Sequence, residues 1–280
     1  MKHRIYLGDN IDILPKLPER YFRLIYIDPP FNTGRQQKRK RLRTVRDENG
    51  DRTGFQGKRF RSEVLSEHFF EDEFDDYLAF LRPRLEQAKR VLTNDGSLFF
   101  HIDFREVHYC KVLLDSIFGR ESFVNEIIWA YDYGARSKTR WSAKHDNILW
   151  YAKNPKNYIF NFEAIDRIPY MAPKLVTPEK AARGKTPTDV WWLTIVSPTG
   201  KEKTGYPTQK PLKLLERIIA VHSNKGDHIL DFFAGTGTTG VAADNLGRYF
   251  TLIDNSPIAA NVMRKRFGLF APEVITCATK

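Results

Sequence analysis

The residues with the clearest chemistry are Asp28, Pro29, Pro30 and Phe31, which follow a strand-like apolar run at 24–27. A carboxylate can accept one N–H of an amino group, and a backbone carbonyl fixed by proline geometry can accept the other. The ring of Phe31 offers a face on which a flat heterocycle can stack. These residues indicate a site that holds a planar heterocycle by its exocyclic amine, although a Pro-Pro pair also occurs in ordinary turns after strands.

A glycine-rich turn forms the second candidate site. It follows a strand-like run at 228–233, and its Gly235 and Gly237 allow a tight turn and a close approach of the backbone to a ligand. A further strand-like run at 249–253 ends in Asp254, which is well placed to bind the hydroxyl groups of a ribose. The pattern indicates a nucleotide-like cofactor.

Two other cofactor classes compete for this pattern. Gly235, Gly237 and Gly240 also fit G-x-G-x-x-G, with Asp254 placed 19 residues after the first glycine, which favours a nicotinamide or flavin site. Such a fold needs a second βαβαβ half, whereas only about one helix and a tail follow Asp254. A Walker-type phosphate loop is excluded, because Val241 stands where its lysine would be.

Taken together, the two sites resemble those of the DNA amino-methyltransferases. Residues 28–31 match the Asp/Asn/Ser-Pro-Pro-Tyr/Phe/Trp motif of that family, and residues 233–237 are similar to its S-adenosylmethionine loop. The catalytic motif precedes the cofactor glycines, as in the β group, and residues 74–118 are similar to type III modification subunits.

Three further landmarks support the resemblance. Gly8-Asp9-Asn10 resembles the third motif of the family, residues 145–151 resemble the eighth, and residues 206–211 resemble the tenth, with Tyr206 in place of the usual His. The resemblance covers most of the chain, except residues 35–68 and 153–205.

The resemblance implies S-adenosylmethionine as the cofactor and direct in-line transfer of its methyl group to a base flipped out of DNA. It assigns catalysis to Asp28, Pro29, Pro30 and Phe31, with the Pro29 carbonyl as the second acceptor. The residues implied in cofactor binding are Asp9, Asn10, Lys210, Asp231, Phe233, Gly235, Gly237, Thr238 and Asp254. Among them, Lys210 is expected near the carboxylate of the cofactor.

The target base is expected to be adenine, methylated at N6, because in this family an Asp as the first residue of the motif at 28–31 usually accompanies adenine. Transfer to N4 of cytosine is the alternative within the family, RNA methylation is a weaker one, and a catalytically inactive DNA-binding module is the alternative of another class. Covalent methylation of cytosine C5 is not expected, because Cys110 and Cys277 do not follow a proline as the nucleophile of that chemistry does.

These site residues must be positioned by alternating strands and helices, which predict an α/β fold with a mostly parallel sheet covered on both faces. The expected strands span 4–8, 24–28, 97–102, 127–131, 147–152, 228–233 and 249–254, and the expected helices span 11–17, 74–92, 106–117, 211–222, 238–246 and 257–267. The strands at 127–131 and 147–152 have no helix between them and are expected to form an antiparallel hairpin. The resemblance implies the Rossmann-like, circularly permuted, seven-stranded methyltransferase fold.

The ends of the strands predict where the site lies. Asp9, Asp28, Asp231 and Asp254 all fall at or just after the end of an expected strand. Ligands of such sheets bind at the carboxyl ends of the strands, so these four side chains are expected to converge, although each one alone could be a helix cap.

We expect three regions along the chain: residues 1–152 as the catalytic half, 153–205 as a target-recognition region by family analogy, and 206–280 as the cofactor-binding half. Residues 35–61 carry eleven bases against three acids. We interpret 35–68 as a basic loop that stays disordered until DNA phosphates neutralise it. Its expected DNA-binding residues are Arg35, Lys38, Arg39, Lys40, Arg41, Arg43, Lys58, Arg59 and Arg61.

Composition limits the remaining possibilities. The formal net charge of +11 favours a polyanionic partner, here double-stranded DNA. No apolar run of membrane length or signal peptide is read, and two cysteines suit a reducing cytoplasm. No metal site is expected, because the seven His residues lack ligand spacing. A homodimer and a cognate restriction endonuclease are further partners that the family suggests.

Overall fold

The computed structural model describes residues 3–33, 37–47, 52–53, 59–70, 74–197, 200, 202–204, 209–268, 272 and 274–277. The chain forms two units. The larger unit consists of Met1–Pro29 and Leu78–Lys280, and the smaller one of Pro30–Tyr77.

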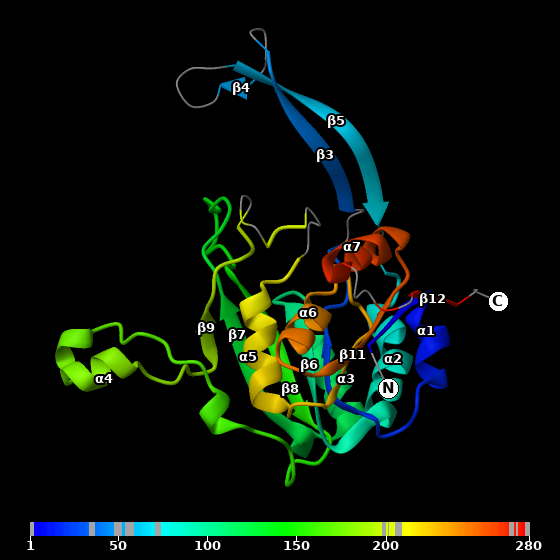
Figure 1. Ribbon diagram of the computed structural model, residues 1–280, viewed down its shortest axis with the longest axis vertical. Coiled ribbons are helices and arrows are strands. Elements are labelled where there is room, and N and C mark those ends of the chain that lie inside the picture. The colour runs from blue at the N-terminus through cyan, green and yellow to red at the C-terminus, as the bar shows by residue number, and fades with distance from the viewer. Residues whose placement is uncertain are drawn as a thin grey trace. The chain divides into compact units, whose positions relative to one another are not determined.

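One sheet organises the larger unit. Its strands in the described part of the chain are β1 (Arg4–Leu7), β2 (Phe22–Ile27), β6 (Leu92–Asp103), β7 (Phe123–Ala130), β8 (His145–Ala152), β9 (Val190–Trp192), β10 (His228–Asp231), β11 (Tyr249–Asp254) and β12 (Val274–Thr276). They lie in the order β12-β1-β11-β10-β2-β6-β8-β7-β9 (Figure 1). All neighbours from β12 to β6 pair in parallel. Strand β8 is antiparallel to β6 and β7, and β9 is parallel to β7.

This topology confirms the predicted α/β fold, its mostly parallel sheet and the antiparallel hairpin of β7 and β8. All seven expected strands are present. The described sheet has nine strands rather than seven, because the short strands β9 and β12 extend its two edges.

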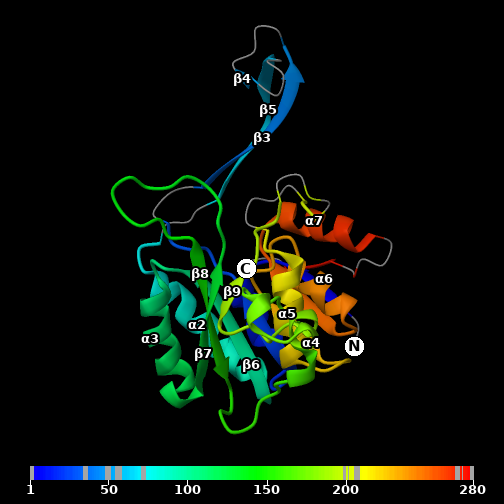
Figure 2. The same cartoon turned by 90° about the vertical axis from the view of Figure 1, so that its left-hand side faces the viewer.

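Helices cover both faces of the sheet. They are α1 (Asn10–Ile13), α2 (Tyr77–Val91), α3 (Val107–Phe118), α4 (Pro178–Arg183), α5 (Leu212–His222), α6 (Thr238–Asn245) and α7 (Pro257–Phe267), with short 3₁₀ turns at Leu14–Lys16, Arg120–Ser122, Phe162–Ala164 and Pro173–Leu175. Figure 2 shows α2 and α3 on one face and α5 and α6 on the other. In α7 the N-cap Ser256 accepts a hydrogen bond from the Ala259 N–H, and Pro257 fills the first turn, where no N–H partner is needed.

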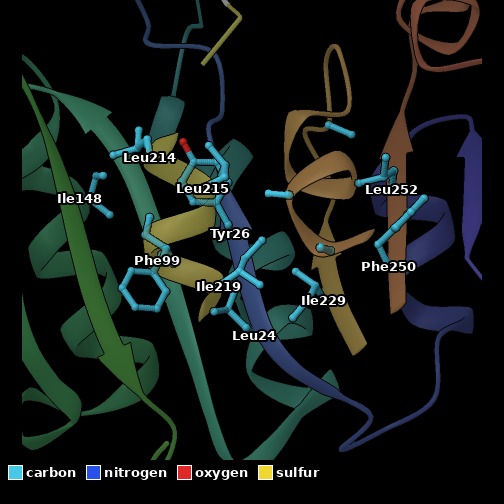
Figure 3. Close-up of a cluster of buried hydrophobic side chains, with 14 of the residues drawn as sticks. Leu24, Tyr26, Phe99, Ile148, Leu214, Leu215, Ile219, Ile229, Phe250 and Leu252 are labelled. Atoms are coloured by element: carbon cyan, nitrogen blue, oxygen red, sulfur yellow. The ribbon is translucent and has the colours of Figure 1, made fainter. Parts of the chain in front are cut away.

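The core under α5 shows why the central strands read as continuous apolar runs. Leu24 and Tyr26 of β2 point to the α5 face, while Ile25 and Ile27, which alternate with them, are also buried. A strand segment covered on both faces carries apolar side chains on both, so it reads as a nearly continuous apolar run. Figure 3 shows Leu24, Tyr26 and Phe99 of the sheet beside α5, whose apolar stripe is formed by Leu214, Leu215, Ile218 and Ile219.

The smaller unit contains β3 (Gln37–Arg46), β4 (Arg52–Thr53) and β5 (Arg59–Phe70), an antiparallel sheet in the order β3-β5-β4. The prediction of a disordered loop at 35–68 is therefore wrong for these residues. The charge count at 35–61 left out Glu63 and Glu67, whose positions in the register face Arg43 and Lys40. Opposite charges at facing positions favour strand pairing.

No helix within the described ranges combines the length and the apolar character needed to span a bilayer.

Candidate active site

Four aspartates gather at one edge of the sheet. Asp28 directly follows β2, Asp9 follows β1 after Gly8, and Asp231 and Asp254 end β10 and β11. These strands are parallel and adjacent in the order β1-β11-β10-β2, so their carboxyl ends meet at one edge. We call this the carboxyl edge. The structure thus brings together four residues that are far apart in the sequence.

Asp28 has one oxygen held and one available. Its Oδ2 lies 2.7 Å from the Lys210 Nζ, and the side chains of Asp28 and Lys210 are only 15% and 13% exposed. Its Oδ1 is buried and has no hydrogen-bond partner among the described residues. A buried acceptor is almost always paired in native proteins, so an unpaired one indicates a group awaiting a donor. Asp28 can therefore accept an N–H from a ligand.

Lys210 forms an ion pair with Asp28, whereas the sequence analysis placed Lys210 near the carboxylate of the cofactor. It precedes α5 by two residues, and Pro211 caps that helix without a side-chain hydrogen bond. Nothing in the sequence signals this ion pair, because its two members are separated by 182 positions.

The rest of the catalytic motif enters the smaller unit. The Tyr77 hydroxyl donates to the Pro30 carbonyl at 2.6 Å, and the Phe74 N–H donates to the Asn32 Oδ1 at 3.3 Å. Asn32 has a φ of 51°, a left-handed conformation that Asn tolerates better than most residues. The turn after Asp28 and Pro29 is thus held from within its own unit. Phe31 is half-buried there.

A chain of buried polar side chains runs behind the site across β2, β6, β8 and β7. The Tyr26 hydroxyl lies 2.6 Å from the His101 Nδ1, and the His101 Nε2 lies 3.2 Å from the Asp146 Oδ2. The Tyr131 hydroxyl donates to the Asp146 Oδ1 at 3.1 Å. Sequence reasoning gave these residues no role; a polar side chain inside an apolar strand was the only available signal.

Burial and neighbouring charges shift the pKa values of Asp146 and Tyr26 in this row of polar side chains. Burial opposes ionisation of Asp146, but hydrogen bonds from His101 and Tyr131 and the charge of Lys210 together hold its pKa below the usual value. Burial, together with the charges of Asp28, Asp231 and Asp146, holds the pKa of Tyr26 far above its usual value. Tyr26 therefore stays a neutral hydroxyl two residues before Asp28.

The glycine turn requires glycine at two of its positions. Gly237 has a φ of 73°, and a Cβ there would lie 2.8 Å from the Met263 Cγ. Gly235 has a φ of 52°, and its N–H donates to the Asp254 Oδ2 at 2.7 Å. The turn is therefore closed by backbone geometry and by the aspartate at the end of the next strand.

Burial raises the pKa of Asp231 to about 7, against hydrogen bonds from the Thr239 hydroxyl at 2.6 Å and the Phe233 N–H at 3.0 Å. Burial likewise raises the pKa of Asp254 to about 6, against bonds from the Ser256 and Gly235 N–H groups. A cation or hydroxyl donor placed beside these carboxylates would stabilise their charged forms.

Arg84 contacts two residues of the Gly8-Asp9-Asn10 motif. Its Nη2 lies 3.1 Å from the Asp9 Oδ1, and its Nε donates to the Asn10 Oδ1 at 2.6 Å. The Asn10 amide in turn donates to the Phe232 carbonyl at 2.7 Å, which ties α1 to the residue after β10. Asp9 also caps α1 by accepting the Ile11 N–H at 3.1 Å. Asp9 and Asn10 thus lie beside the glycine turn.

The remaining predicted cofactor residues border the same turn. The Thr238 Oγ1 accepts a hydrogen bond from the Arg266 Nη1 at 2.8 Å, and Arg266 also binds the Thr236 carbonyl at 3.1 Å. The rings of Phe233 and Phe80 lie 6.1 Å apart. Neither Arg84 nor Arg266 was predicted as a site residue.

The predicted DNA-binding bases fall on the smaller unit. Lys38, Arg39, Lys40, Arg41 and Arg43 lie on β3, Arg59 and Arg61 are exposed on β5, and Arg35 and Lys58 lie outside the described residues. In the region 153–205 Trp191 is buried, whereas Trp192 is 75% exposed. The structure does not test the three-region division of the chain, which stays a prediction. Across the described ranges, no three His, Cys, Asp or Glu side chains form a group that could hold a metal.

Known proteins resemble this chain in sequence. A family described as DNA methylase matches residues 22–265. The type II methyltransferase M.HpaI of Haemophilus parainfluenzae is 30% identical over 248 residues, which cover 89% of this chain and 68% of that protein. The DNA adenine methyltransferase YhdJ of Escherichia coli K12 is 31% identical over 255 residues, which cover 88% of this chain and 76% of that protein.

Solved structures agree in fold. A complex of M1.HpyAVI with SAM superimposes with a TM-score of 0.61 at 23% identity, covering 95% of this chain and 99% of that one. The cytosine-N4-specific PvuII DNA methyltransferase superimposes with a TM-score of 0.66 at 16% identity, covering 96% and 87%. These findings confirm the resemblance that the motifs indicated: the chain belongs to the DNA methylase family of N6 and N4 amino-methyltransferases.

Proposed function

We propose that this protein transfers a methyl group from S-adenosylmethionine to N6 of an adenine in double-stranded DNA. The observation that carries the proposal is the arrangement of the Asp28 carboxylate. Its Oδ2 forms an ion pair with Lys210, and its Oδ1 is buried without a hydrogen-bond partner among the described residues. An exocyclic amine supplies the N–H that such an oxygen lacks. YhdJ, an adenine methyltransferase by name, supports adenine as the base.

The residues of this chain activate the amine by accepting its hydrogens. The lone pair of an exocyclic amine is delocalised into the ring, which makes the nitrogen a weak nucleophile. The Asp28 Oδ1 takes one N–H and the Pro29 carbonyl takes the other, so the nitrogen moves toward tetrahedral geometry and its lone pair localises. Phe31 stacks on the base. Catalysis comes mainly from acceptors that are in place before the reaction.

Lys210 acts as a positioning residue. Its ion pair with the Asp28 Oδ2 fixes the rotation of the carboxylate, which leaves the Oδ1 for the amine. Once methylated, the nitrogen is strongly acidic and gives its proton to the Asp28 carboxylate or to water, so no strong base is needed. We assign Lys210 to Asp28 rather than to the cofactor carboxylate.

The glycine turn fits S-adenosylmethionine, whose sulfonium supplies the electrophilic methyl group when it is bound. Gly235 and Gly237 keep side chains out of the turn. Asp231 would bind the ammonium and Asp254 the ribose hydroxyls of the cofactor. Burial raises the pKa values of both carboxyl groups, and a cation or a hydroxyl donor beside them would stabilise their charged forms. The other residues of this proposed site are Asp9, Asn10, Phe233 and Thr238.

The DNA contacts of this function are proposed from charge and position. The bases at 35–61 would bind backbone phosphates, and residues 153–205 would recognise the sequence around the target. Because the target base lies inside a duplex, it must be flipped out to reach Asp28.

Transfer to N4 of cytosine is the second candidate, because the fold of the cytosine-N4-specific PvuII enzyme superimposes on this chain with a TM-score of 0.66. A cytosine amine could meet the same two acceptors. Asp28 therefore explains activation of the amine of either base, whereas the family motif and the similarity to YhdJ favour adenine.

Nucleoside mass spectrometry tests the proposal. PCR-amplified phage λ DNA, which carries no methylated bases, is incubated with the protein and S-adenosylmethionine and then digested to nucleosides. N6-methyladenine supports the proposal, whereas N4-methylcytosine keeps the chemistry and overturns the base. An Asp28→Ala variant should bind S-adenosylmethionine yet form no product. Wild-type protein that binds the cofactor but methylates nothing would overturn the function.

A further inference from the structure

The loop between β7 and β8 lies at the carboxyl edge. Strand β8 is antiparallel to both β6 and β7, so β7 ends where β6 and β2 end. The loop leaves β7 after Ala130 and enters β8 at His145. Figures 1 and 2 show this green loop rising from the same side of the sheet to which the strands β2 and β6 run.

The root of this loop is fixed to the site. The Tyr131 N–H donates to the Lys144 carbonyl at 2.9 Å, and the Lys144 Nζ donates to the carbonyls of Tyr133 and Ala135. The Tyr131 hydroxyl joins the buried chain through Asp146 and His101. The loop is therefore anchored on β8 and β7, which lie two and three strands away from β2, the strand that Asp28 follows.

Trp141 stands at the exposed part of the loop. Its side chain is 99% exposed, the highest value among the large hydrophobic residues that the structure describes, and Tyr133 of the same loop is 57% exposed. Water contact over a whole indole is unfavourable, and large aromatic side chains are usually well buried. An indole presented in this way suits a flat partner on which it can stack.

The charge of the loop identifies that partner. Residues 132–144 contain Arg136, Lys138, Arg140 and Lys144 but only one acid, Asp132. Asp132 is paired with Arg136 at 2.7 Å. Lys138 and Arg140 are exposed and have no ion-pair partner in the described part of the chain. Two basic side chains without ion-pair partners just before an exposed aromatic residue fit nucleic acid, since the basic side chains bind phosphates and the ring stacks on a nucleobase.

We propose that residues 132–144 form a second DNA-binding element, in which Lys138 and Arg140 bind backbone phosphates and Trp141 stacks on a base of the duplex beside the flipped target. This inference rests on the proposed function. The ring fills the place that the target base vacates or caps the neighbouring base, which stabilises the flipped state without touching the reacting amine.

Base flipping is measured with duplexes in which 2-aminopurine replaces the target base, in the sequence that methylated-base sequencing of λ DNA identifies. Trp141→Ala should reduce the rise in 2-aminopurine emission on binding and lower kcat/KM on the intact duplex about tenfold, the order expected for one aromatic–base stack. Removing the base opposite the target, which favours flipping, should restore most of that loss. Trp141→Phe should retain most of the activity.

Tyr249→Ala provides the matched control. Tyr249 is 39% exposed and is the first residue of β11, so it lies at the edge of the sheet opposite the carboxyl edge and outside residues 153–205. Its loss should change neither emission nor kcat/KM. Wild-type emission and affinity in Trp141→Ala would overturn the inference, as would an equal loss on intact and base-deleted duplexes.

A binding measurement separates this inference from the proposed function. Fluorescence anisotropy with a PCR-amplified λ fragment needs no catalysis. Replacing Lys138 and Arg140 by alanine should reduce the magnitude of the slope of log K against log salt concentration by about two, because two phosphate contacts are lost. An unchanged slope overturns the phosphate contacts even if the wild-type protein methylates DNA. Conversely, if the wild-type protein fails to methylate DNA but the variant shows the reduced slope, the proposed function is overturned and the DNA-binding element is supported.

Discussion

At the scale of single residues, the Lys210–Asp28 pair decides how the catalytic carboxylate is presented. Replacing Lys210 by Met should lower the single-turnover methylation rate on the order of 100-fold, because a misplaced acceptor no longer localises the amine lone pair. Affinity for S-adenosylmethionine, measured by calorimetry, should change little. Lys210→Arg should recover part of the rate.

Lys213→Met is the matched control, since Lys213 is exposed on the first turn of α5, only three residues further along. It should behave as the wild type. If Lys210→Met instead weakened cofactor binding and kept its rate at saturating cofactor, Lys210 would belong to the cofactor site.

Asp231 gives a pH dependence of stability with a defined sign. Burial raises its pKa to about 7 in the folded protein, above the value of about 4 of an unfolded chain. The folded state therefore binds more protons between these values, so the contribution of Asp231 to stability falls as pH rises from about 4 to 7 and stays level above that. Asp231→Asn, which keeps the shape, should gain thermal stability relative to the wild type over this window.

The comparison requires melting temperatures of both proteins without cofactor at several pH values. A difference that stays constant from pH 4 to 7 would contradict the raised pKa. Thr239 and Phe233 offer partners to either side chain, so Asn should not unfold the turn.

The sequence could predict part of this site because some signals are local. Asp28 and Asp254 each close an apolar run, and the rule that parallel strands end at one edge brings them together. The ion pair of Lys210 and the chain from Tyr26 to Tyr131 could not be predicted, because these contacts depend on which side chains meet across strands.

At the scale of elements, long periodic segments were predictable and short ones were not. The helix expected at 257–267 has these bounds in α7, where Ser256 caps its start. Strand β9 has three residues, too few for a periodic signal, and exists because it pairs with β7, where Trp129 faces Trp191 in register. The pairing of β3 and β5 was hidden by the density of basic residues.

The close packing of α6 on its neighbours predicts the effect of one methyl group. A Cβ at Gly240 would lie 2.7 Å from the Leu252 Cδ1 of β11 and 2.9 Å from the Phe267 Cζ of α7. Gly240→Ala should therefore destabilise the protein by about 1–3 kcal/mol, as overpacking does, despite the better helix propensity of alanine. Urea denaturation measures this as a lower midpoint.

Asn245→Ala is the control for helix propensity, because Asn245 is exposed at the end of the same helix. It should leave the midpoint nearly unchanged. A Gly240→Ala protein more stable than the wild type would mean that the helix can move away from β11 without cost.

At the scale of the whole molecule, the excess of positive charge is unevenly distributed. The net charge is +11, and residues 35–61 alone contribute eleven bases against three acids, that is 11 − 3 = +8. A duplex releases counterions for each phosphate that is neutralised, so the location of these charges should determine the salt dependence of binding.

Replacing the four bases at residues 38–41 by alanine should reduce the slope of log K against log salt by up to about four and weaken binding to all DNA sequences alike. The control removes the same charge from Lys16, Arg20, Arg120 and Lys225, which are exposed. These residues precede β2, β7 or β10, so they lie at the edge opposite Asp28. Their loss should change the slope much less, because long-range attraction is screened beyond about 8 Å at physiological salt. Equal slopes for the two variants would show that net charge alone, rather than direct phosphate contacts in the smaller unit, governs binding to DNA.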